Sequence, residues 1–299
     1  MKVLVCDKTE KECIEQMRAA GLTVDTNFEI TPEDLMTTLP AYDVAVVRSR
    51  TKIRQPLIDV CPNLKLIVRG GVGLDTIDVE YARGKGIEVR NTPLASSDSV
   101  AELAIGYMFM MARSLYKASE TMKAEKWEKK AFNGDEIGGK ILGLIGIGNI
   151  GKATARRATA LGMSVVAYDP YVTTFEYGQL VGLDELLTQA DYISLHLPKT
   201  KESANMIGAE QFAKMKDGVR IINCARGGII NEDALYEALT SGKVAAAALD
   251  VFVEEPPTDW KLLKLDNVIG SPHIGAATKE GQGRVGAEVA QIVIDFAKK

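Results

Sequence analysis

One glycine-rich stretch constrains the fold of this chain more than any other: GLIGIGNIG, at residues 143–151. It follows a largely apolar run at 140–142 and precedes a run of good helix formers at 152–161, so it predicts a strand, a tight turn and a helix. The turn has the G-x-G-x-x-G spacing, which brings a pyrophosphate against the free N–H groups of a helix N-terminus. Its three fixed positions are Gly146, Gly148 and Gly151.

An acidic residue supports the same interpretation. The next expected strand, 163–168, is followed by Asp169, about 20 residues beyond the turn, where a carboxylate accepts hydrogen bonds from both ribose hydroxyls of NAD. That carboxylate would repel the additional phosphate of NADP, and Pro170 rather than an arginine follows it. The stretch therefore predicts an NAD site; the alternative is a structural glycine turn beside an unrelated acid.

Composition excludes several other classes of protein. A length of 299 residues suits two domains, and 46% hydrophobic with 25% charged residues is ordinary for a globular protein. The net charge of −4 argues against a nucleic-acid surface, and no apolar run is long enough to span a bilayer. The apolar part of 1–7 is too short for a signal peptide, so we expect a cytoplasmic protein. Four cysteines without zinc spacing and only two histidines predict free thiols and no metal site.

The first third of the chain alternates short apolar runs with helical patterns. Strands are expected at 3–6, 43–47, 65–68 and 87–89, and such uninterrupted runs favour buried parallel strands covered by helices on both faces. Ligands of such sheets bind beyond the carboxyl ends of the strands. The candidate binding residues are therefore those that follow two of these strands: Arg48, Ser49 and Arg50, and Arg69, Gly70, Gly71, Val72 and Gly73. For each arginine the alternative is a solvated loop or an ion pair.

A second series of strands and helices begins at residue 140. Strands are expected at 140–145, 163–168, 191–195, 219–223, 244–249 and 267–270. Six strands with intervening helices around a G-x-G-x-x-G turn predict a doubly wound α/β domain. A buried helix is expected from about 100 to beyond 113, and a final helix at 278–297. The charged, amphipathic segment at 116–132 is either a solvated arm or a partner-binding surface.

Three strand ends of the second series carry residues with chemical potential. Arg226 would present its guanidinium fork to a carboxylate in a bidentate manner that lysine cannot reproduce. Asp250 and the pair Glu254–Glu255 follow the next strand, although a solvated turn is the simplest interpretation of that pair. His273 lies in a Pro-His-x-Gly loop and is favoured as the proton-transfer residue over His196, which ends an apolar strand.

In this order and spacing, the motifs resemble the D-isomer-specific 2-hydroxyacid dehydrogenase family over essentially the whole chain. The matching stretches are the glycine turn with Asp169, NCARGG at 223–228, ALDVF with its EEPP tail at 248–257, and SPHIGA at 271–276. The resemblance implies a catalytic set of Arg226, Glu255 and His273, where Glu255 is chosen because the family's acid directly precedes the proline. It implies that NAD contacts the glycine turn, Asp169 and the following residues: Asn149, Ile150, Cys224, Ala225, Arg226, Asp250, His273 and Ala276. Asp250 would lie near the nicotinamide amide.

The family's architecture implies two doubly wound parallel-sheet domains. A flavodoxin-like substrate domain is expected at 1–94 and 272–299, interrupted by a Rossmann NAD-binding domain at 95–271. The active site would be the cleft between the domains, and hinge closure would exclude water. In the implied reaction Arg226 binds the substrate carboxylate and 2-oxygen, His273 exchanges the hydroxyl proton, and Glu255 holds His273.

Within the family, the chain resembles most the branch that oxidises D-3-phosphoglycerate for serine biosynthesis. The resemblance lies in the loops at 47–49, 68–75 and 91–93 and in WEKKAF at 127–132. The implied substrate-binding residues are Arg48, Ser49, Arg69, Gly71, Val72, Gly73, Arg226 and His273. Arg48 and Arg69 would face the phosphate, with Lys129 contributed by the second subunit of a homodimer. Val72 and Leu197 stand where this branch often has hydroxyl residues. Because the chain ends at Lys299, neither a C-terminal regulatory domain nor serine feedback is expected.

Two other functions stay open on the sequence. A reductase of hydroxypyruvate, glyoxylate or another small 2-oxo acid would share all the catalytic residues and differ only in the cationic pocket. An NAD(H)-sensing binding protein of the corepressor type would not need the complete catalytic set, which makes it the remote alternative. We expect no nucleic-acid or membrane partner.

Overall fold

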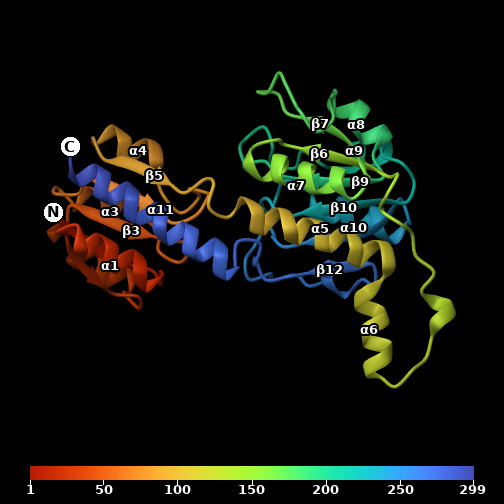
Figure 1. Cartoon of the computed structure of the whole chain (residues 1–299), viewed down its shortest axis with the longest axis horizontal. Coiled ribbons are helices and arrows are strands. Elements are labelled where there is room, and N and C mark those ends of the chain that lie inside the picture. Colours follow the sequence, from red (N-terminus) through yellow and green to blue (C-terminus); the bar gives the residue numbers. More distant parts are fainter. The chain divides into compact units, whose positions relative to one another are not determined.

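The computed structural model describes all 299 residues and divides into two compact units, each built on its own parallel sheet. The first unit comprises residues 1–97 and 276–299, and the second comprises residues 98–275. The chain thus leaves the first unit, forms the second, and returns to the first with its last helix, drawn in blue in Figure 1. None of the helices combines the length and the apolarity needed to cross a membrane.

The first unit contains a five-stranded sheet in the order β2-β1-β3-β4-β5, with every pair parallel. Its strands are β1 (Lys2–Val5), β2 (Thr23–Thr26), β3 (Val44–Val47), β4 (Leu66–Arg69) and β5 (Glu88–Asn91). Its helices are α1 (Lys11–Ala19), α2 (Pro32–Thr38), η1 (Leu39–Ala41), α3 (Gln55–Asp59), α4 (Val79–Gly84) and α11 (Lys279–Ala297). The order is that of flavodoxin-like sheets, in which the direction of winding reverses between β1 and β3. The predicted fold class is confirmed here.

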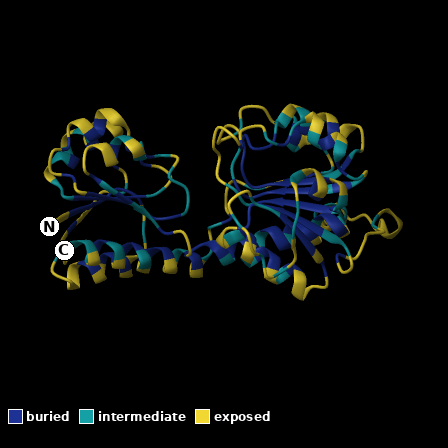
Figure 2. Ribbon diagram, turned by 90° about the horizontal axis from the view of Figure 1, so that it is seen from above, coloured by how far each residue is buried: buried dark blue, intermediate teal, exposed yellow.

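Helices cover both faces of this sheet because alternate strand residues point to opposite sides. Val3, Val5, Val44 and Val46 pack with α1 and α11, whereas Leu4, Ala45 and Val47 pack with α2, α3 and α4. Figure 2 shows the result as dark central strands between helices whose outer faces are exposed. At Gly286 of α11, a Cβ atom would lie 3.3 Å from the Cβ atoms of Glu10 and Cys13, so the glycine permits the close approach of the chain around α1.

The second unit contains a seven-stranded parallel sheet in the order β12-β11-β10-β9-β6-β7-β8. Its strands are β6 (Ile141–Ile145), β7 (Ser164–Tyr168), β8 (Gln179–Leu180), β9 (Tyr192–Leu195), β10 (Val219–Asn223), β11 (Val244–Leu249) and β12 (Val268–Gly270). Its helices are α5 (Ser97–Arg113), α6 (Leu115–Lys123), η2 (Lys129–Ala131), α7 (Asn149–Ala160), α8 (Leu183–Gln189), α9 (Ala209–Lys214), α10 (Glu232–Thr240) and η3 (Leu262–Lys264). Winding outward in both directions from β6 is the Rossmann arrangement.

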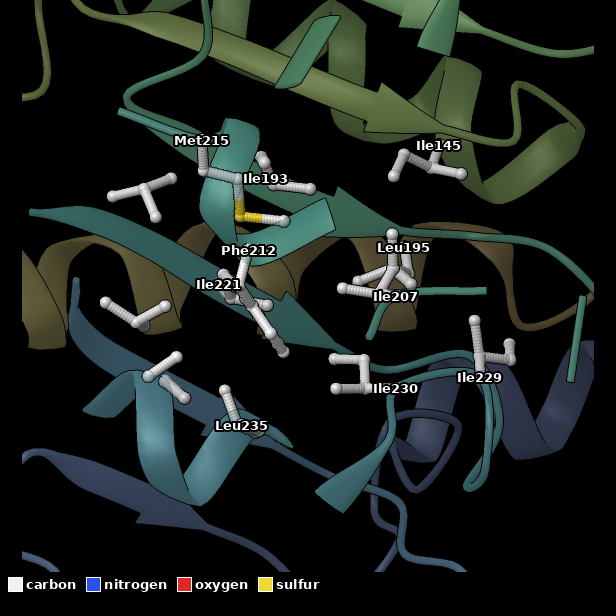
Figure 3. Close-up of a cluster of buried hydrophobic side chains, with 14 of the residues drawn as sticks. Ile145, Ile193, Leu195, Ile207, Phe212, Met215, Ile221, Ile229, Ile230 and Leu235 are labelled. Carbon is white, nitrogen blue, oxygen red and sulfur yellow. The ribbon is translucent and has the colours of Figure 1, made fainter. Parts of the chain in front are cut away.

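This sheet too lies between two helical layers. One layer is formed by α8, α9 and α10, whose leucines and Phe212 pack on Ile145, Ile193, Leu195 and Ile221 in the cluster of Figure 3. The other is formed by α5 and α7, where small residues such as Ala155 bring α7 close to the sheet. The expected burial of the first part of α5 is confirmed, since Ala104 and Met108 have no exposed surface.

Two strands and one helix boundary differ from the sequence expectations. β2 has only one buried residue, Val24, and β8 has two residues, so neither carries the apolar run that marked the other strands. The helix expected to continue beyond 113 ends at Arg113, because Ser114 has a left-handed backbone with φ +46°, and the separate helix α6 follows and ends at Lys123. The remainder of the segment at 116–132 extends as a loop with the short η2 turn, and Trp127 in it is 79% exposed.

Candidate functional site

The predicted glycine turn joins β6 to α7, and its three glycines meet three different steric demands. Gly146 has φ +90°, and a Cβ atom there would lie 2.5 Å from the His196 carbonyl oxygen. At Gly151 a Cβ atom would lie 2.3 Å from the Gly146 carbonyl oxygen, so a side chain would separate α7 from the turn. At Gly148, by contrast, a Cβ atom would meet nothing within 4 Å. The turn is therefore closed on its protein side and open where a pyrophosphate would approach the start of α7.

Asp169 follows β7, the neighbour of β6 in the sheet, and its carboxylate is tied to the glycine turn. Oδ2 accepts from the Ile147 amide at 3.0 Å, and Oδ1 accepts from the Tyr171 amide at 2.9 Å. These bonds hold the carboxylate beside the turn, at the position where a ribose carrying two hydroxyls would be recognised. The residues present thus fit an NAD cofactor.

A cavity of about 280 Å³ lies against the same turn. Gly146, Gly148 and Asp169 line it, as does Leu197, which stands where the resembling branch often has a hydroxyl residue at the cofactor. Other lining residues were not singled out from the sequence as cofactor contacts: Tyr168, Tyr171, His196, Thr200 and Met206. Most of the latter follow β9, which pairs with β6 on the side opposite β7. The sequence could have indicated the residues after β9, because the carboxyl end of a strand adjacent to a glycine turn lines the same crevice.

The second group of candidate residues follows three strands that are neighbours in the sheet. Arg226 follows β10, Glu255 follows β11, and His273 follows β12. Because these parallel strands pair in the order β12-β11-β10, their carboxyl ends lie along one edge and bring the three loops together. Of the other expected cofactor contacts, Asn149 and Ile150 begin α7, Cys224 and Ala225 follow β10, and Ala276 belongs to the first unit.

The loop that carries Arg226 is shaped by Asn223 and by two glycines. Asn223 accepts from the Ala225 amide at 3.0 Å and donates to the Arg226 carbonyl at 3.0 Å, which closes the turn after β10. A Cβ atom on Gly227 would lie 1.7 Å from the Phe252 carbonyl oxygen, so this position admits only glycine. The arginine is thereby presented on a tight loop packed against the chain that follows β11.

His273 and Glu255 form a direct pair. Nδ1 of His273 lies 2.6 Å from Oε2 of Glu255, and Oε1 of Glu255 accepts from the Phe252 amide at 3.1 Å. Partial burial raises the pKa of Glu255, but the hydrogen bonds from His273 and Phe252, with the charges of His273 and Arg226, outweigh it and leave that pKa lowered. A carboxylate that stays ionised and engages Nδ1 leaves Nε2 as the nitrogen for proton exchange.

Asp250 anchors the loop that carries His273. Its buried carboxylate accepts from the Ile274 amide at 2.8 Å, the Gly275 amide at 2.7 Å and the Ser271 hydroxyl. The hydroxyl of Tyr107 on α5 is hydrogen-bonded to Ser271 in turn. His273 itself has φ +53°, a left-handed conformation that a non-glycine residue keeps only when its surroundings enforce it. Tyr107 and Ser271 were not predicted, because their role depends on contacts between distant segments.

The expected substrate residues of the first unit follow β3 and β4, which pair directly. Arg48 and Ser49 come after β3, and the loop of Gly71, Val72 and Gly73 comes after Arg69 at the end of β4. Thr92 accepts from the Gly71 amide at 2.7 Å, and Asn91 donates to the Val72 carbonyl at 2.5 Å, so the last residue of β5 and the one after it hold this loop. A Cβ atom on Gly71 would lie 1.5 Å from Nη1 of Arg69, which shows that the guanidinium folds over the glycine.

Comparison with known proteins identifies a family. The NAD-binding domain of the D-isomer specific 2-hydroxyacid dehydrogenases matches residues 105–275. The chain is 50% identical over 294 residues to a hydroxypyruvate reductase of Thermotoga maritima, covering 97% of this chain and 96% of that protein. It is 47% identical over 303 residues to a D-3-phosphoglycerate dehydrogenase of Archaeoglobus fulgidus, of which it spans 58%. A D-lactate dehydrogenase of Aquifex aeolicus, solved with NAD and lactic acid, has a TM-score of 0.87 at 32% identity, covering 100% of this chain and 96% of that one.

Proposed function

This chain belongs to the D-isomer-specific 2-hydroxyacid dehydrogenase family, and we propose that within it the protein oxidises D-3-phosphoglycerate to 3-phosphohydroxypyruvate for serine biosynthesis. The single observation that supports this chemistry most strongly is the His273–Glu255 pair at 2.6 Å, on the same sheet edge as Arg226. An imidazole oriented by a carboxylate, next to an arginine that binds carboxylates, is the set that proton removal from a 2-hydroxy acid requires.

We assign the steps to the residues as follows. Arg226 binds the substrate carboxylate and the 2-oxygen through its fork and fixes C2 in place. His273 takes the proton of the 2-hydroxyl at Nε2 during oxidation and returns it during reduction. Glu255 orients the ring through Nδ1 and stabilises the protonated imidazole. The glycine turn and Asp169 would hold NAD, and the bound cofactor would supply the acceptor for the C2 hydride.

The phosphate part of the proposal rests on the cationic residues after β3 and β4. The guanidinium of Arg48 has no hydrogen-bond or ion-pair partner within the protein, although the residue is half-buried. A half-buried cation without a partner is suited to an anionic ligand. Arg69 ends the neighbouring strand, so both residues lie at the carboxyl edge where ligands of such sheets bind. We propose that Ser49 and the loop at 71–73 add hydrogen-bond donors to the same site.

Hydroxypyruvate reduction is the second candidate. It is favoured by the 50% identity to the Thermotoga maritima hydroxypyruvate reductase over 96% of that protein's length. The two reactions use the same Arg226, Glu255 and His273 and differ in whether the substrate carries a phosphate. Arg48 and Arg69 are therefore the residues that separate the two candidates.

A substrate panel tests the proposal. The purified protein is given D-3-phosphoglycerate with NAD or NADP, and hydroxypyruvate, glyoxylate or 3-phosphohydroxypyruvate with NADH, and the absorbance of NADH is followed. We expect turnover with NAD and the highest kcat/KM for the phosphorylated pair. A higher kcat/KM for hydroxypyruvate than for 3-phosphohydroxypyruvate would favour the second candidate, hydroxypyruvate reduction. NADH binding without any turnover would indicate a sensor instead.

We also propose that the protein is a cytoplasmic homodimer whose α6–η2 arm reaches a second copy. Trp127, Met122 and Leu115 expose 79%, 55% and 49% of their surface along this arm, which is a large apolar area for a monomer. Lys129 would then approach the phosphate of the neighbouring copy. Sedimentation equilibrium tests the dimer, and Lys129→Ala should raise KM only for phosphorylated substrates.

A further inference from the structure

A buried carboxylate that the catalytic scheme does not use lies at the carboxyl end of β1. Asp7 is 4% exposed and accepts four hydrogen bonds from the chain that follows β3. The donors are the Arg48 amide at 2.5 Å, the Thr51 amide at 3.2 Å, the Thr51 hydroxyl at 2.7 Å and Nε of Arg50 at 3.1 Å. A single side chain thus gathers residues 48–51, at the switch point between β1 and β3.

Arg50 also belongs to this arrangement, and all of its side-chain nitrogens make hydrogen bonds within the protein. Besides its bond to Asp7, its Nη1 donates to the Ile30 carbonyl at 3.1 Å and its Nη2 donates to the Cys6 carbonyl at 2.7 Å. Each of its three nitrogens therefore has a partner in the protein. A guanidinium with these bonds would have to break them in order to bind a ligand.

Arg48 is two residues away and is engaged differently. Only its main-chain amide bonds to Asp7, while its side-chain stem lies beside Gly70, where a Cβ atom would be 3.6 Å from Cγ of Arg48. Burial lowers the pKa of Arg48, and the charges of Asp7 and Glu10 partly offset that effect. An arginine in such a setting remains charged at neutral pH. The backbone of Arg48 is thus fixed, whereas its guanidinium is available.

We propose that Asp7 and Arg50 are positioning residues for an anion site in which Arg48 makes the contact with a phosphate group. This inference deepens the proposed function and rests on it for the identity of the anion, a phosphorylated 2-hydroxy or 2-oxo acid. The buried carboxylate fixes the main chain from which Arg48 projects, and Arg50 links that carboxylate to the main chain just after β1 and just before α2. The two arginines of the Arg-Ser-Arg sequence therefore have different roles: Arg48 binds and Arg50 supports.

Steady-state kinetics with a phosphorylated and an unphosphorylated substrate test the proposal. Arg48→Ala should lower kcat/KM for 3-phosphohydroxypyruvate by about 10- to 100-fold through the loss of a charge-assisted bond, with little change for hydroxypyruvate. Arg50→Met and Asp7→Asn should each raise KM for the phosphorylated substrate on the order of tenfold, through misplacement of Arg48, with kcat nearly unchanged. Arg50 is the more exposed of the two sites, with 48% of its side chain exposed. Its loss removes the ion-pair partner of the buried Asp7 carboxylate, which keeps its three hydrogen bonds from Arg48 and Thr51.

A matched control and a double-mutant cycle separate positioning from general damage. Arg18 also donates through Nε and Nη2 to a main-chain carbonyl, that of Val24, but lies away from the β3–β4 edge. Arg18→Met should lower thermal stability without changing the substrate preference. In an Arg48→Ala background, Arg50→Met should have no further effect on KM, because the residue that it positions is gone. Additive effects in this cycle would overturn the inference.

The failure of this inference can be told apart from the failure of the proposed function. If Arg48→Ala is selective for the phosphorylated substrate but Arg50→Met and Asp7→Asn are not, the function stands and the positioning role is wrong. If phosphorylated substrates are not turned over at all, the same site can be tested by calorimetry. The quantity measured is then the affinity of the full chain for inorganic phosphate. Arg48→Ala, Arg50→Met and Asp7→Asn should each weaken that binding, and Arg18→Met should not. Equal phosphate affinity in all four variants would refute the inference.

Discussion

The Nδ1 atom of His273 lies 2.6 Å from Oε2 of Glu255, although 18 residues separate them in the chain. The pair forms because β11 and β12 are adjacent parallel strands, and because the Asp250 carboxylate bonds to Ser271 before His273 and to Ile274 and Gly275 after it. Glu255 thus sets the orientation of the His273 ring, and Asp250 holds the loop in which His273 keeps its left-handed backbone.

Replacement of His273 by alanine should lower kcat by about 10²–10⁴-fold, since a positioned general acid–base contributes that much. The affinity for NADH should stay within a few-fold of wild type, because the glycine turn and Asp169 are untouched. Stopped-flow turnover and fluorescence titration with NADH measure the two quantities. If the variant lost NADH binding together with turnover, the result would contradict a proton-transfer role for His273.

Glu255→Gln should reduce kcat by about tenfold or more, because the amide can no longer stabilise a protonated His273 through Nδ1. The adjacent Glu254 provides a matched control, since its carboxylate accepts from the Thr258 hydroxyl and not from His273. Glu254→Gln should retain wild-type kcat and the same dependence of kcat on pH. Equal losses in the two variants would mean that the acid of the pair has been assigned to the wrong glutamate.

Gly151→Ala should destabilise the protein by about 1–3 kcal/mol and weaken NADH binding, because its methyl group would lie 2.3 Å from the Gly146 carbonyl oxygen. Gly283 also lies in a helix, α11, but has room for a side chain. A Cβ atom there meets nothing within 4 Å, so Gly283→Ala should stabilise the helix by about 0.5–1 kcal/mol. Urea unfolding measures both changes, and destabilisation by Gly283→Ala would contradict the packing described for α11.

His196 should make the folded state sensitive to moderate acid. Burial lowers its pKa from 6.5 to about 4, so below pH 6.5 the unfolded chain binds a proton that the folded chain does not bind until near pH 4. Stability is therefore lost as the pH falls through this window, by up to about 2 kcal/mol between pH 7 and pH 5. Urea unfolding at several pH values should show a shallower loss for His196→Asn. An identical pH dependence in the variant and the wild type would show that His196 does not cause it.

Much of the second unit could be predicted because its signals are local. The glycine turn, the strand before it, the helix after it and Asp169 lie within about 30 residues, which is one βαβ unit. The strand ends that carry Arg226, Glu255 and His273 were also visible as apolar runs followed by polar residues. The roles of these residues as a catalytic set came from family resemblance and stay a prediction until variants are measured.

Other features followed only from tertiary structure. β2 and β8 lack apolar runs, so they are recognisable as strands only by their pairing with β1 and β7. The family resemblance implied Arg48 as a phosphate contact and gave Arg50 no role. The contacts of Arg50 depend on Asp7, which is 43 residues away in the chain. Tyr107 likewise reaches Ser271 across 164 residues.

The sequence by itself determined the fold class, the cofactor turn and the places where polar residues leave the strands, because those properties depend on spacing along a short stretch of chain. Tertiary structure alone decided which strand ends are neighbours, that Asp250 fixes the loop of His273, and that Asp7 engages the guanidinium of Arg50 but only the main chain of Arg48. The physical reason is that hydrogen bonding and burial act between side chains that the order of strands in each sheet brings together.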